Sequence, residues 1–502
     1  MRYILGIDIG TTAIKGAVIG EDGKIYGTKT SEYPLTTLPT GEVEADLQLY
    51  INAFTQSIKG AVEDAKVDVA DIKCVGFSST AETCVFLDKY NEPLCKVIAW
   101  MDTRATKEAE YLTAHFDKKD IINKVGFDGI YAIHPVSKIL AVKNKNPEIF
   151  EKTRMFAQIK DYFIYRLTGE YYTDHSTASD HGFFDITNRC YWNEMLEFTG
   201  IKEEYLPKLV EPGTELGTIS REAALEFGLN PETKINVGAF DQGCGAIGAG
   251  NTKPGIASES TGSALVTVAT IDALNPDSQG DVPTLCSGIP GKYMYQPYCT
   301  GSIIMKWYRD IFCEAEKMVE EQTGLNAYTQ MDEMVKATPA GADGLIMLPY
   351  FQGSGIPELN EKAEGVYYGI NAGHTRGHFI RAIMEGLAIA LKRMLECEEK
   401  LGATMTEIRS LGGGSKSKAW CQIKADILDM PVKVINNSET PCMGCAILAG
   451  VANGMWNSID EAMEKFVTIK ETYYPNPDNK EIYENVYNKY VEVTKALNPT
   501  FK

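Results

Sequence analysis

Several features that define other protein classes are missing from this chain of 502 residues. No apolar run approaches the roughly 18 residues that cross a bilayer. The longest candidate, Cys442–Val451, is shorter and contains two glycines. The opening MRYILGIDIG lacks the apolar core of an export signal. Acidic residues outnumber basic ones, 68 to 49, and the net charge of -19 disfavours nucleic acid. We therefore expect a cytoplasmic protein with no membrane or nucleic-acid partner.

Signatures of metal and redox sites are scarce as well. The six histidines show no metal-ligand spacing, and the twelve cysteines are scattered apart from Cys442 and Cys445. That pair lies among small residues at helical spacing, without a second Cys or His pair, so we interpret it as packed core. A redox or metal role is the alternative. No Walker A sequence is present, which excludes a P-loop nucleotide site.

Strand and helix patterns alternate along the chain, which is typical of α/β architecture. At roughly 100–200 residues per domain, this length predicts two large domains. We expect the boundary near residue 250, in GAGNTKPG, giving domains 1–250 and 251–502. The predicted strands cover residues 4–8, 14–19, 72–78, 97–100, 235–240, 256–259, 264–269, 408–411 and 432–435. Helices are predicted over 241–250 and 417–428, with a further helix in the C-terminal tail.

Two hairpins share one plan: a strand, an acidic residue, a tight Gly/Thr/Ser turn and a second strand. The first turn is Gly10-Thr11-Thr12 with Asp8, and the second is Ser260-Thr261-Gly262-Ser263. Such turns expose backbone N–H groups and hydroxyls, which can bind phosphate without a cationic side chain. Either turn alone is also compatible with a plain hairpin. Together they favour a nucleotide held by both halves of the chain.

Asp241 and Gln242 follow a predicted strand and begin a Gly-rich helix. A carboxylate at this position can accept a hydroxyl proton during phosphoryl transfer. The alternative is a helix N-cap, for which Asp is well suited. The glycines at 243, 245 and 248 match the dinucleotide fingerprint, but no acidic residue closes a second strand about 20 residues later. Phosphoryl transfer is therefore favoured over dinucleotide binding.

Three further segments are candidates for ligand binding. Gly412-Gly413-Gly414 lies between a strand and a helix, where a flat ligand can approach the backbone; a flexible loop is the alternative. In AWMDTR, Trp100, Asp102 and Arg104 suit the C–H face and the hydroxyls of a sugar, or form a solvated ion pair. Glu82 ends the preceding hairpin strand and is a candidate, with a surface acid as the alternative.

In their order and spacing, these segments resemble the FGGY family of carbohydrate kinases over essentially the whole chain. The matching segments are LGIDIGTTAIKG, AWMDTR, GAFDQGCGAIGAG, ESTGS, GSIIMKWYRD and LGGGSKSKAW. The resemblance implies two actin-like (ribonuclease H-like) domains, each a mixed central sheet flanked by helices, with the active site in the interdomain cleft. It implies a sugar-binding, catalytic domain at 1–250 and an ATP-binding domain at 251–502. ATP and Mg²⁺ are the implied cofactors, and a small sugar or polyol is the implied substrate. The oligomeric state stays open, with a homodimer among the alternatives.

The resemblance also implies roles for single residues. Asp241 matches the catalytic base, and Asp8 matches the acid that helps to hold Mg²⁺. The positions that match sugar-binding residues are Glu82, Trp100, Asp102, Asp241 and Gln242. The positions that match nucleotide-binding residues are Gly10, Thr11, Thr12, Lys15, Thr261, Gly262, Gly413, Gly414 and Lys418.

The segment around Glu82 bears on the identity of the substrate. Thr80-Ala81-Glu82-Thr83 stands where bacterial xylulokinases typically carry Gln-Met-His-Gly and glycerol kinases carry Arg-Glu. Ala81 in place of Arg removes a bidentate hydroxyl clamp. A pentulose similar to xylulose is favoured, and autoinducer-2, L-fuculose, glycerol, erythritol and gluconate stay open. Gluconate is disfavoured because Arg104 is the only candidate cation of that region. A non-catalytic ATP- or sugar-binding sensor is the alternative from another class.

Overall fold

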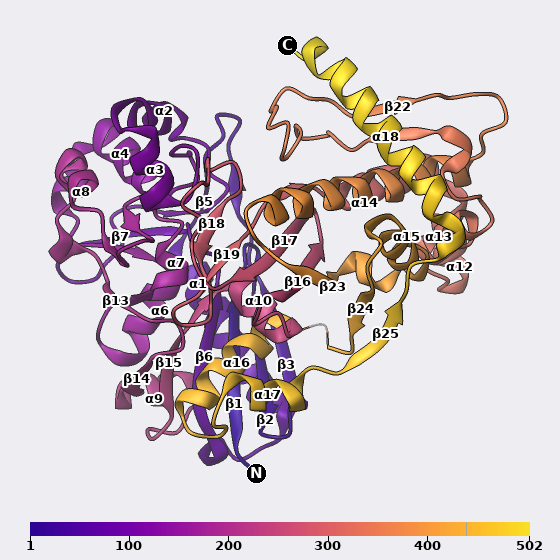
Figure 1. The fold of residues 1–502 in the computed structure, drawn as a ribbon. Coiled ribbons are helices and arrows are strands. Elements are labelled where there is room, and N and C mark those ends of the chain that lie inside the picture. Colours follow the sequence, from indigo (N-terminus) through magenta and orange to yellow (C-terminus); the bar gives the residue numbers. More distant parts are fainter. Residues whose placement is uncertain (438) are drawn as a thin grey trace. The chain divides into compact units, whose positions relative to one another are not determined.

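The structure is a computed structural model that describes residues 1–437 and 439–502. The chain forms two compact units, each made from more than one stretch of sequence (Figure 1). Unit 1 comprises Met1–Thr252, Ile271–Met294 and Glu439–Val467, and unit 2 comprises Lys253–Thr270, Tyr295–Ser438 and Thr468–Lys502. The boundary expected at residue 250 falls where the first stretch of unit 1 ends. Two later stretches also belong to unit 1, so a single cut in the sequence does not separate the units.

Unit 1 is built around a mixed sheet in the order β14-β15-β6-β1-β2-β3. Its strands are β1 (Tyr3–Ile9), β2 (Ala13–Gly20), β3 (Ile25–Glu32), β6 (Ile72–Ser79), β14 (Glu215–Thr218) and β15 (Lys234–Phe240). β1 and β15 both run parallel to β6, whereas β1, β2 and β3 form an antiparallel meander. The strands predicted at 4–8, 14–19, 72–78 and 235–240 are confirmed.

Both faces of this sheet are covered by helices. Leu5, Ile7 and Ile9 pack into a core with α1 (Leu47–Ala65), α6 (Ile159–Thr168) and α9 (Arg221–Phe227). Ile4 belongs to the core on the other face, with α10 (Asp241–Ala249), α16 (Thr440–Ala452) and α17 (Ile459–Phe466). Strands buried on both faces read as nearly continuous apolar runs, which explains why they were recognisable in the sequence.

The helix α16 packs against β1, β6 and α10, although it follows them by some 190 residues or more of chain. A Cβ on Gly6 would lie 2.4 Å from the Cys442 carbonyl oxygen, and one on Gly444 would lie 1.9 Å from that of Cys244. The backbones thus approach so closely that only glycine fits. Cys442 and Cys445 are buried in this helix, which confirms that the pair is packed core.

The glycines of the apparent dinucleotide fingerprint also serve this packing. Gly243, Gly245 and Gly248 lie inside α10 and not in a strand-to-helix turn. A Cβ on Gly248 would lie 2.1 Å from the Thr440 carbonyl oxygen. The dinucleotide interpretation therefore lacks the turn that it requires.

Smaller elements of unit 1 carry the remaining candidate residues. A second sheet runs in the order β4 (Thr36–Thr37), β5 (Val43–Ala45), β8 (Val97–Ile98), β7 (Cys84–Leu87) and β9 (Met155–Gln158). The AWMDTR segment follows β8, and Glu82 precedes β7. Outside this sheet are α2 (Thr106–His115), α3 (Lys118–Val125), α4 (Pro135–Lys145), α5 (Pro147–Lys152), α7 (His175–Ala178) and α8 (Asn193–Thr199).

Unit 2 has a mixed sheet in which β17 (Ala264–Ile271), β16 (Gly255–Thr261), β23 (Met405–Gly412), β24 (Val432–Ile435) and β25 (Ile469–Tyr473) follow one another, and β20 (Tyr298–Thr300) pairs with β17. Its helices include α11 (Ile303–Phe312), α12 (Glu314–Thr323), α13 (Ala327–Lys336), α14 (Arg376–Lys400), α15 (Lys418–Leu428) and α18 (Lys480–Leu497). α15 and α18 place Trp420 and Tyr490 in the core, which confirms both predicted helices. Among the described residues, no helix is long and apolar enough to cross a membrane.

Candidate active site

Three parallel strands of unit 1 end side by side, and two candidate acids lie at these ends. Asp8 on β1 pairs in register with Ser78 on β6, and Phe240 on β15 pairs with Ser79. Asp241 follows Phe240 directly, so both aspartates belong to the carboxyl edge of the same sheet. In open α/β sheets this edge is where ligands bind.

Asp8 is held by a neighbour on the adjacent strand. Its Oδ1 accepts a hydrogen bond from the Ser78 hydroxyl at 2.8 Å. Burial raises the pKa of Asp8 to about 6, against the opposing effects of Ser78 and Lys15. Lys15 on β2 forms an ion pair with Glu439 at 2.6 Å. The ammonium group that lowers the pKa of Asp8 is thus paired with a different carboxylate.

Asp241 is the first residue of α10. The N-cap position belongs to Phe240, so the N-cap alternative for Asp241 is wrong. Burial raises the pKa of Asp241 well above its usual range, and the charges of Asp8 and Glu82 add to the shift. Within the described residues its Oδ1 is buried and accepts no hydrogen bond. A buried polar atom without a partner inside the protein is a candidate contact for a ligand.

Two further carboxyl groups, those of Glu82 and Asp180, interact electrostatically with Asp241 or with each other. Burial raises the pKa of Glu82, and Lys138 offsets this only in part. Burial also raises the pKa of Asp180 well above its usual range, with Glu82 and Asp241 adding to the shift. Since like charges this close cannot all ionise without cost, the cluster favours bound hydroxyl donors or a cation. The sequence reasoning missed Asp180, because a lone acid in TASDHG carries no signal of its own.

The segment before Asp180 fixes the start of α10. The Ser176 hydroxyl accepts a hydrogen bond from the Phe240 backbone N–H at 3.0 Å. Ser176 is anchored in turn by Asp174, which accepts its backbone N–H at 2.9 Å and forms a buried ion pair with Lys160. The residue that precedes Asp241 is therefore tied to a fully buried charged network. No local pattern in the sequence links residues this far apart.

The first Gly/Thr turn is connected to the aromatic candidate. The Trp100 indole N–H donates to the Thr11 hydroxyl at 2.8 Å. Gly10 donates its N–H to the Ala13 carbonyl at 3.0 Å, and the Thr12 carbonyl accepts the N–H of Tyr33 at 2.9 Å. The turn is therefore a closed hairpin with one hydroxyl oriented by the indole.

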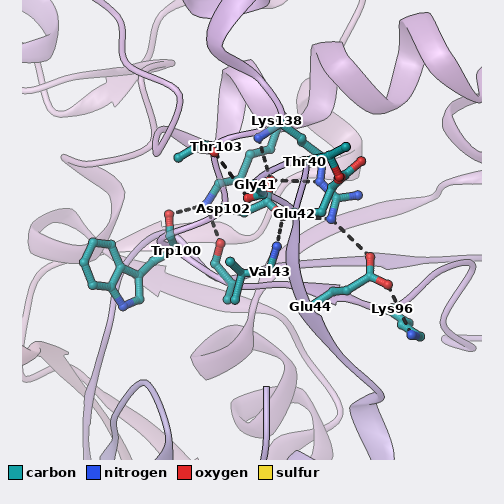
Figure 2. A network of polar contacts seen from close by, with 12 residues as sticks. Thr40, Gly41, Glu42, Val43, Glu44, Lys96, Trp100, Asp102, Thr103 and Lys138 are labelled. Atoms are coloured by element: carbon teal, nitrogen blue, oxygen red, sulfur yellow. Dashed lines mark hydrogen bonds and ion pairs between the residues drawn. The ribbon is translucent and has the colours of Figure 1, made fainter. Parts of the chain in front are cut away.

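Asp102 is fully buried, and its carboxylate is used inside the protein (Figure 2). Oδ2 accepts the Val43 N–H at 2.6 Å and an Arg104 guanidinium N–H at 2.8 Å. Oδ1 accepts the Arg104 backbone N–H at 3.0 Å and its Nε–H at 2.8 Å. Arg104 also donates to Glu44 at 3.1 Å. Because a carboxylate accepts about four hydrogen bonds, Asp102 has little capacity left for a sugar hydroxyl.

Lys138 joins the two loops that carry Glu82 and Trp100. It is fully buried, and its ammonium group donates to the carbonyl oxygens of Glu82, Ala99 and Trp100 at 2.8, 2.9 and 2.9 Å. The three donors of the Lys138 ammonium group are thus all used. Arg104 likewise directs its Nε and Nη2 donors to Asp102 and Glu44.

The candidates of unit 2 form a second group. Thr261 and Gly412 pair in register on β16 and β23. A Cβ on Gly414 would lie 2.7 Å from the Thr261 Cβ, and Gly412 has a φ of 71°, which L side chains rarely adopt. The second Gly/Thr turn and the Gly412–Gly414 loop are therefore packed together. Lys418, by contrast, is largely exposed at the start of α15 and pairs with Glu471 at 3.2 Å.

Comparison with known proteins extends this picture to the whole chain. The model described as FGGY family of carbohydrate kinases, N-terminal domain, matches residues 3–248, and its C-terminal counterpart matches residues 277–453. A xylulose kinase of Bacillus subtilis (strain 168) is 30% identical over 508 residues, covering 100% of this chain and 99% of the relative. A gluconokinase of the same strain is 28% identical over 503 residues, covering 99% of this chain and 96% of the relative.

A solved structure agrees with these relatives. The crystal structure of ligand-bound xylulose kinase from Lactobacillus acidophilus has a TM-score of 0.91 and 26% identity, covering 100% of this chain and 99% of that one. The two-domain fold with mixed sheets flanked by helices is thus shared along the full length. With both family domains matched, the chain belongs to the FGGY family of carbohydrate kinases.

Proposed function

We propose that this kinase transfers the γ-phosphoryl group of Mg-ATP to a hydroxyl of a small, uncharged sugar or polyol, with a pentulose similar to xylulose favoured. Asp241 is the proposed general base. The observation that carries the proposal is the Asp241 Oδ1 atom, which is buried at the strand edge and has no hydrogen-bond partner in the described part of the chain. A substrate hydroxyl would supply that missing donor.

In the proposed reaction the protein forms no covalent bond to the substrate or to the phosphoryl group. The substrate oxygen forms a bond to the γ-phosphorus while the bond to the ADP oxygen breaks, and the hydroxyl proton moves to Asp241. Burial, Asp8 and Glu82 raise the pKa of Asp241, and a general base is most effective when its pKa lies near the working pH. Phosphoryl transfer of this kind depends mainly on positioning and electrostatics.

The carboxylates at the strand edge fit a divalent cation. Mg²⁺ prefers oxygen ligands and binds through one or two carboxylates plus phosphate oxygens. Asp8 would hold it, with the Ser78 hydroxyl orienting the carboxylate. When bound, Mg²⁺ neutralises charge on the phosphate oxygens. The raised pKa of Asp8 fits this role, because a carboxyl whose ionised form is disfavoured by burial gains from a neighbouring cation.

The charge balance of unit 1 supports an uncharged substrate. Glu82, Asp180 and Asp241 contribute carboxyl groups to the same cluster. Lys138 uses its three ammonium donors on protein carbonyl oxygens, and Arg104 donates through Nε and Nη2 to Asp102 and Glu44. An anionic substrate such as gluconate would therefore meet a cluster of carboxyl groups, and the Lys138 ammonium group would have no donor left to bind it. This favours a ketose or polyol over a sugar acid.

The other candidate residues are of two kinds: those that we propose contact the sugar or the nucleotide, and those that hold a loop of the site in place. We propose Trp100 as a platform for the sugar, with its bond to Thr11 fixing it beside the first phosphate turn. Asp102 serves to hold the AWMDTR loop. The proposed substrate contacts are Glu82, Trp100, Asp241, Gln242 and the additional Asp180. The proposed nucleotide contacts are Gly10, Thr11, Thr12, Lys15, Gly262, Gly413, Gly414 and, through its backbone, Thr261; Lys418 is kept as a candidate from the resemblance alone.

The test is a coupled ADP-release assay with Mg-ATP over a panel of carbohydrates. The panel contains D-xylulose, L-xylulose, D-ribulose, L-fuculose, glycerol, erythritol, gluconate and autoinducer-2. One uncharged ketose or polyol should exceed gluconate in kcat/KM by roughly 100-fold or more, about 2.7 kcal/mol of discrimination. Preference for gluconate would refute the charge argument. Binding of sugar and ATP without turnover would favour the sensor alternative.

Asp241→Asn tests the base directly. We expect kcat to fall by about 10²–10⁴-fold while calorimetry still detects sugar binding, because the amide keeps the size but cannot take the proton. The matched control is Asp277→Asn, an exposed aspartate in a turn of the same unit. A variant at Asp241 with turnover equal to this control would eliminate the base assignment.

A further inference from the structure

A buried ion pair lies directly beneath the second Gly/Thr turn of unit 2. Lys424 of α15 and Glu259 of β16 approach to 2.5 Å, and each side chain is 1% exposed. Glu259 is the acidic residue of the second hairpin, but nothing in the sequence connects it with Lys424, because 165 residues separate them along the chain. Buried charged groups with a partner are rare enough to need an explanation.

The pair is the centre of a small hydroxyl network. The Lys424 ammonium donates to the Thr261 hydroxyl at 3.0 Å, and that hydroxyl donates to Glu259 Oε2 at 2.6 Å. The Ser410 hydroxyl donates to Glu259 Oε1. Thr261 therefore uses both its donor and its acceptor inside the protein, so its side chain points into the network and not toward a ligand.

The network joins three segments that carry or border the nucleotide candidates. Thr261 lies in the second turn, Ser410 precedes the Gly412–Gly414 loop by two residues, and Lys424 lies on the helix after that loop. The strand register already sets Thr261 opposite Gly412. The charges fix a third element, α15, against the two strands.

Stability alone is a poor explanation for this pair. Removing two charges from water costs several kcal/mol per ion, and buried ion pairs are often replaced by apolar residues with no loss of stability. What the pair adds is a defined geometry, because Lys424 must meet Glu259 and Thr261 at once. In some proteins such buried polar groups fix a single conformation or register.

We propose that Glu259 and Lys424 are positioning residues that lock the second Gly/Thr turn to the Gly412–Gly414 loop and so preorganise unit 2 for nucleotide binding. This inference rests on the proposed function of unit 2 as the ATP-binding part. Neither residue touches the nucleotide. Both act through the backbone of Thr261 and Gly412.

The test is the double variant Glu259→Gln/Lys424→Met, which removes both charges and keeps similar volumes. We expect the KM for ATP and the Kd for ADP to rise by roughly tenfold or more, while the KM for the sugar changes by less than about twofold. The urea midpoint of the double variant should stay close to that of the parent. Such a split between ATP and sugar is not produced by a general loss of packing.

Two more variants keep the test decisive. Ser410→Ala removes one oxygen from the network with little risk to folding, and should raise the KM for ATP by about threefold. Lys433→Met is the matched control, because Lys433 forms an ion pair with Glu407 on the neighbouring strands, away from the turn; it should leave the KM for ATP unchanged.

The outcomes separate the inference from the function on which it rests. Unchanged ATP and ADP affinity in folded Ser410→Ala or in the folded double variant would overturn the positioning role. An equal rise in the Lys433→Met control would overturn it too. If the parent protein itself bound neither ATP nor ADP, the proposed function would fail, whatever the variants did.

Discussion

Glu398 in α14 offers a pH-dependent test of how the core of unit 2 is held. Its side chain is 0% exposed. Oε1 accepts the Thr267 hydroxyl at 2.6 Å, and Oε2 has no partner in the described part of the chain. Burial raises the pKa of Glu398 from 4.5 to about 8; the Thr267 hydrogen bond opposes this shift and Glu399 adds to it. The perturbation is Glu398→Gln, which cannot ionise.

The sign of the effect follows from the raised pKa. Below about pH 4.5 the group is protonated in both the folded and the unfolded chain, and its full contribution to stability is present. Between about pH 4.5 and 8 the unfolded chain loses the proton while the folded chain keeps it. Stability is therefore lost as pH rises, by at most about 1.4 kcal/mol per pH unit. Over the whole interval the upper bound is about 5 kcal/mol.

The assay is urea unfolding followed by tryptophan fluorescence between about pH 5 and 9. At the acidic end we expect Glu398→Gln to be about 1–2 kcal/mol less stable than the parent, because the amide buries donors without partners. The order should reverse toward the alkaline end, where the parent carries a buried charge. Glu484→Gln, an exposed change in the same unit, is the control. Parallel pH profiles for the parent and Glu398→Gln would refute the reasoning.

Further predictions concern unit 1 and the cation. Asp102→Asn should lower the free energy of unfolding by about 3–5 kcal/mol, measured in urea, because it leaves Arg104 without its buried carboxylate; an unchanged midpoint would contradict the supporting role. Gly444→Ala should give insoluble or strongly destabilised protein, seen as a drop in melting temperature, because the Cβ would lie 1.9 Å from the Cys244 carbonyl oxygen. Trp100→Phe keeps an aromatic platform but loses the indole N–H, so we expect turnover to fall about tenfold with the variant still folded, as judged by circular dichroism. Chelation of divalent cations should abolish ADP release and added Mg²⁺ should restore it; full activity with chelator present would exclude the cation from the reaction.

The sequence predicted most of the two sheets because their strands are apolar on both faces. Ile4, Leu5 and Ile7 belong to cores on opposite sides of β1, which leaves a continuous apolar run in the sequence. The glycine turns were visible for a similar reason, since few residues tolerate the φ of Gly412. Local chemistry of this kind can be recognised without any partner residue.

What the sequence could not predict depends on partners that are distant along the chain. Asp102 resembled a sugar ligand until the donors from Val43 and Arg104 were counted. The Thr261 hydroxyl resembled a phosphate contact, yet it is directed into the pair of Glu259 and Lys424. In each case the residue type suited the ligand, and the folded chain had already used its capacity for hydrogen bonds.

The late position of α16 has a consequence for biosynthesis. The strands of the first sheet are translated early, but α16, one of the helices that cover one of its faces, begins only at Thr440. Until then the apolar side chains of Ile4, Cys74 and Ala239 lack the α16 residues with which they share a core in the finished protein. A nascent chain or a truncated product that stops before Thr440 exposes hydrophobic surface of the kind that chaperones and proteases recognise. Premature stop codons before Thr440 should therefore yield fragments that are degraded and not a stable half.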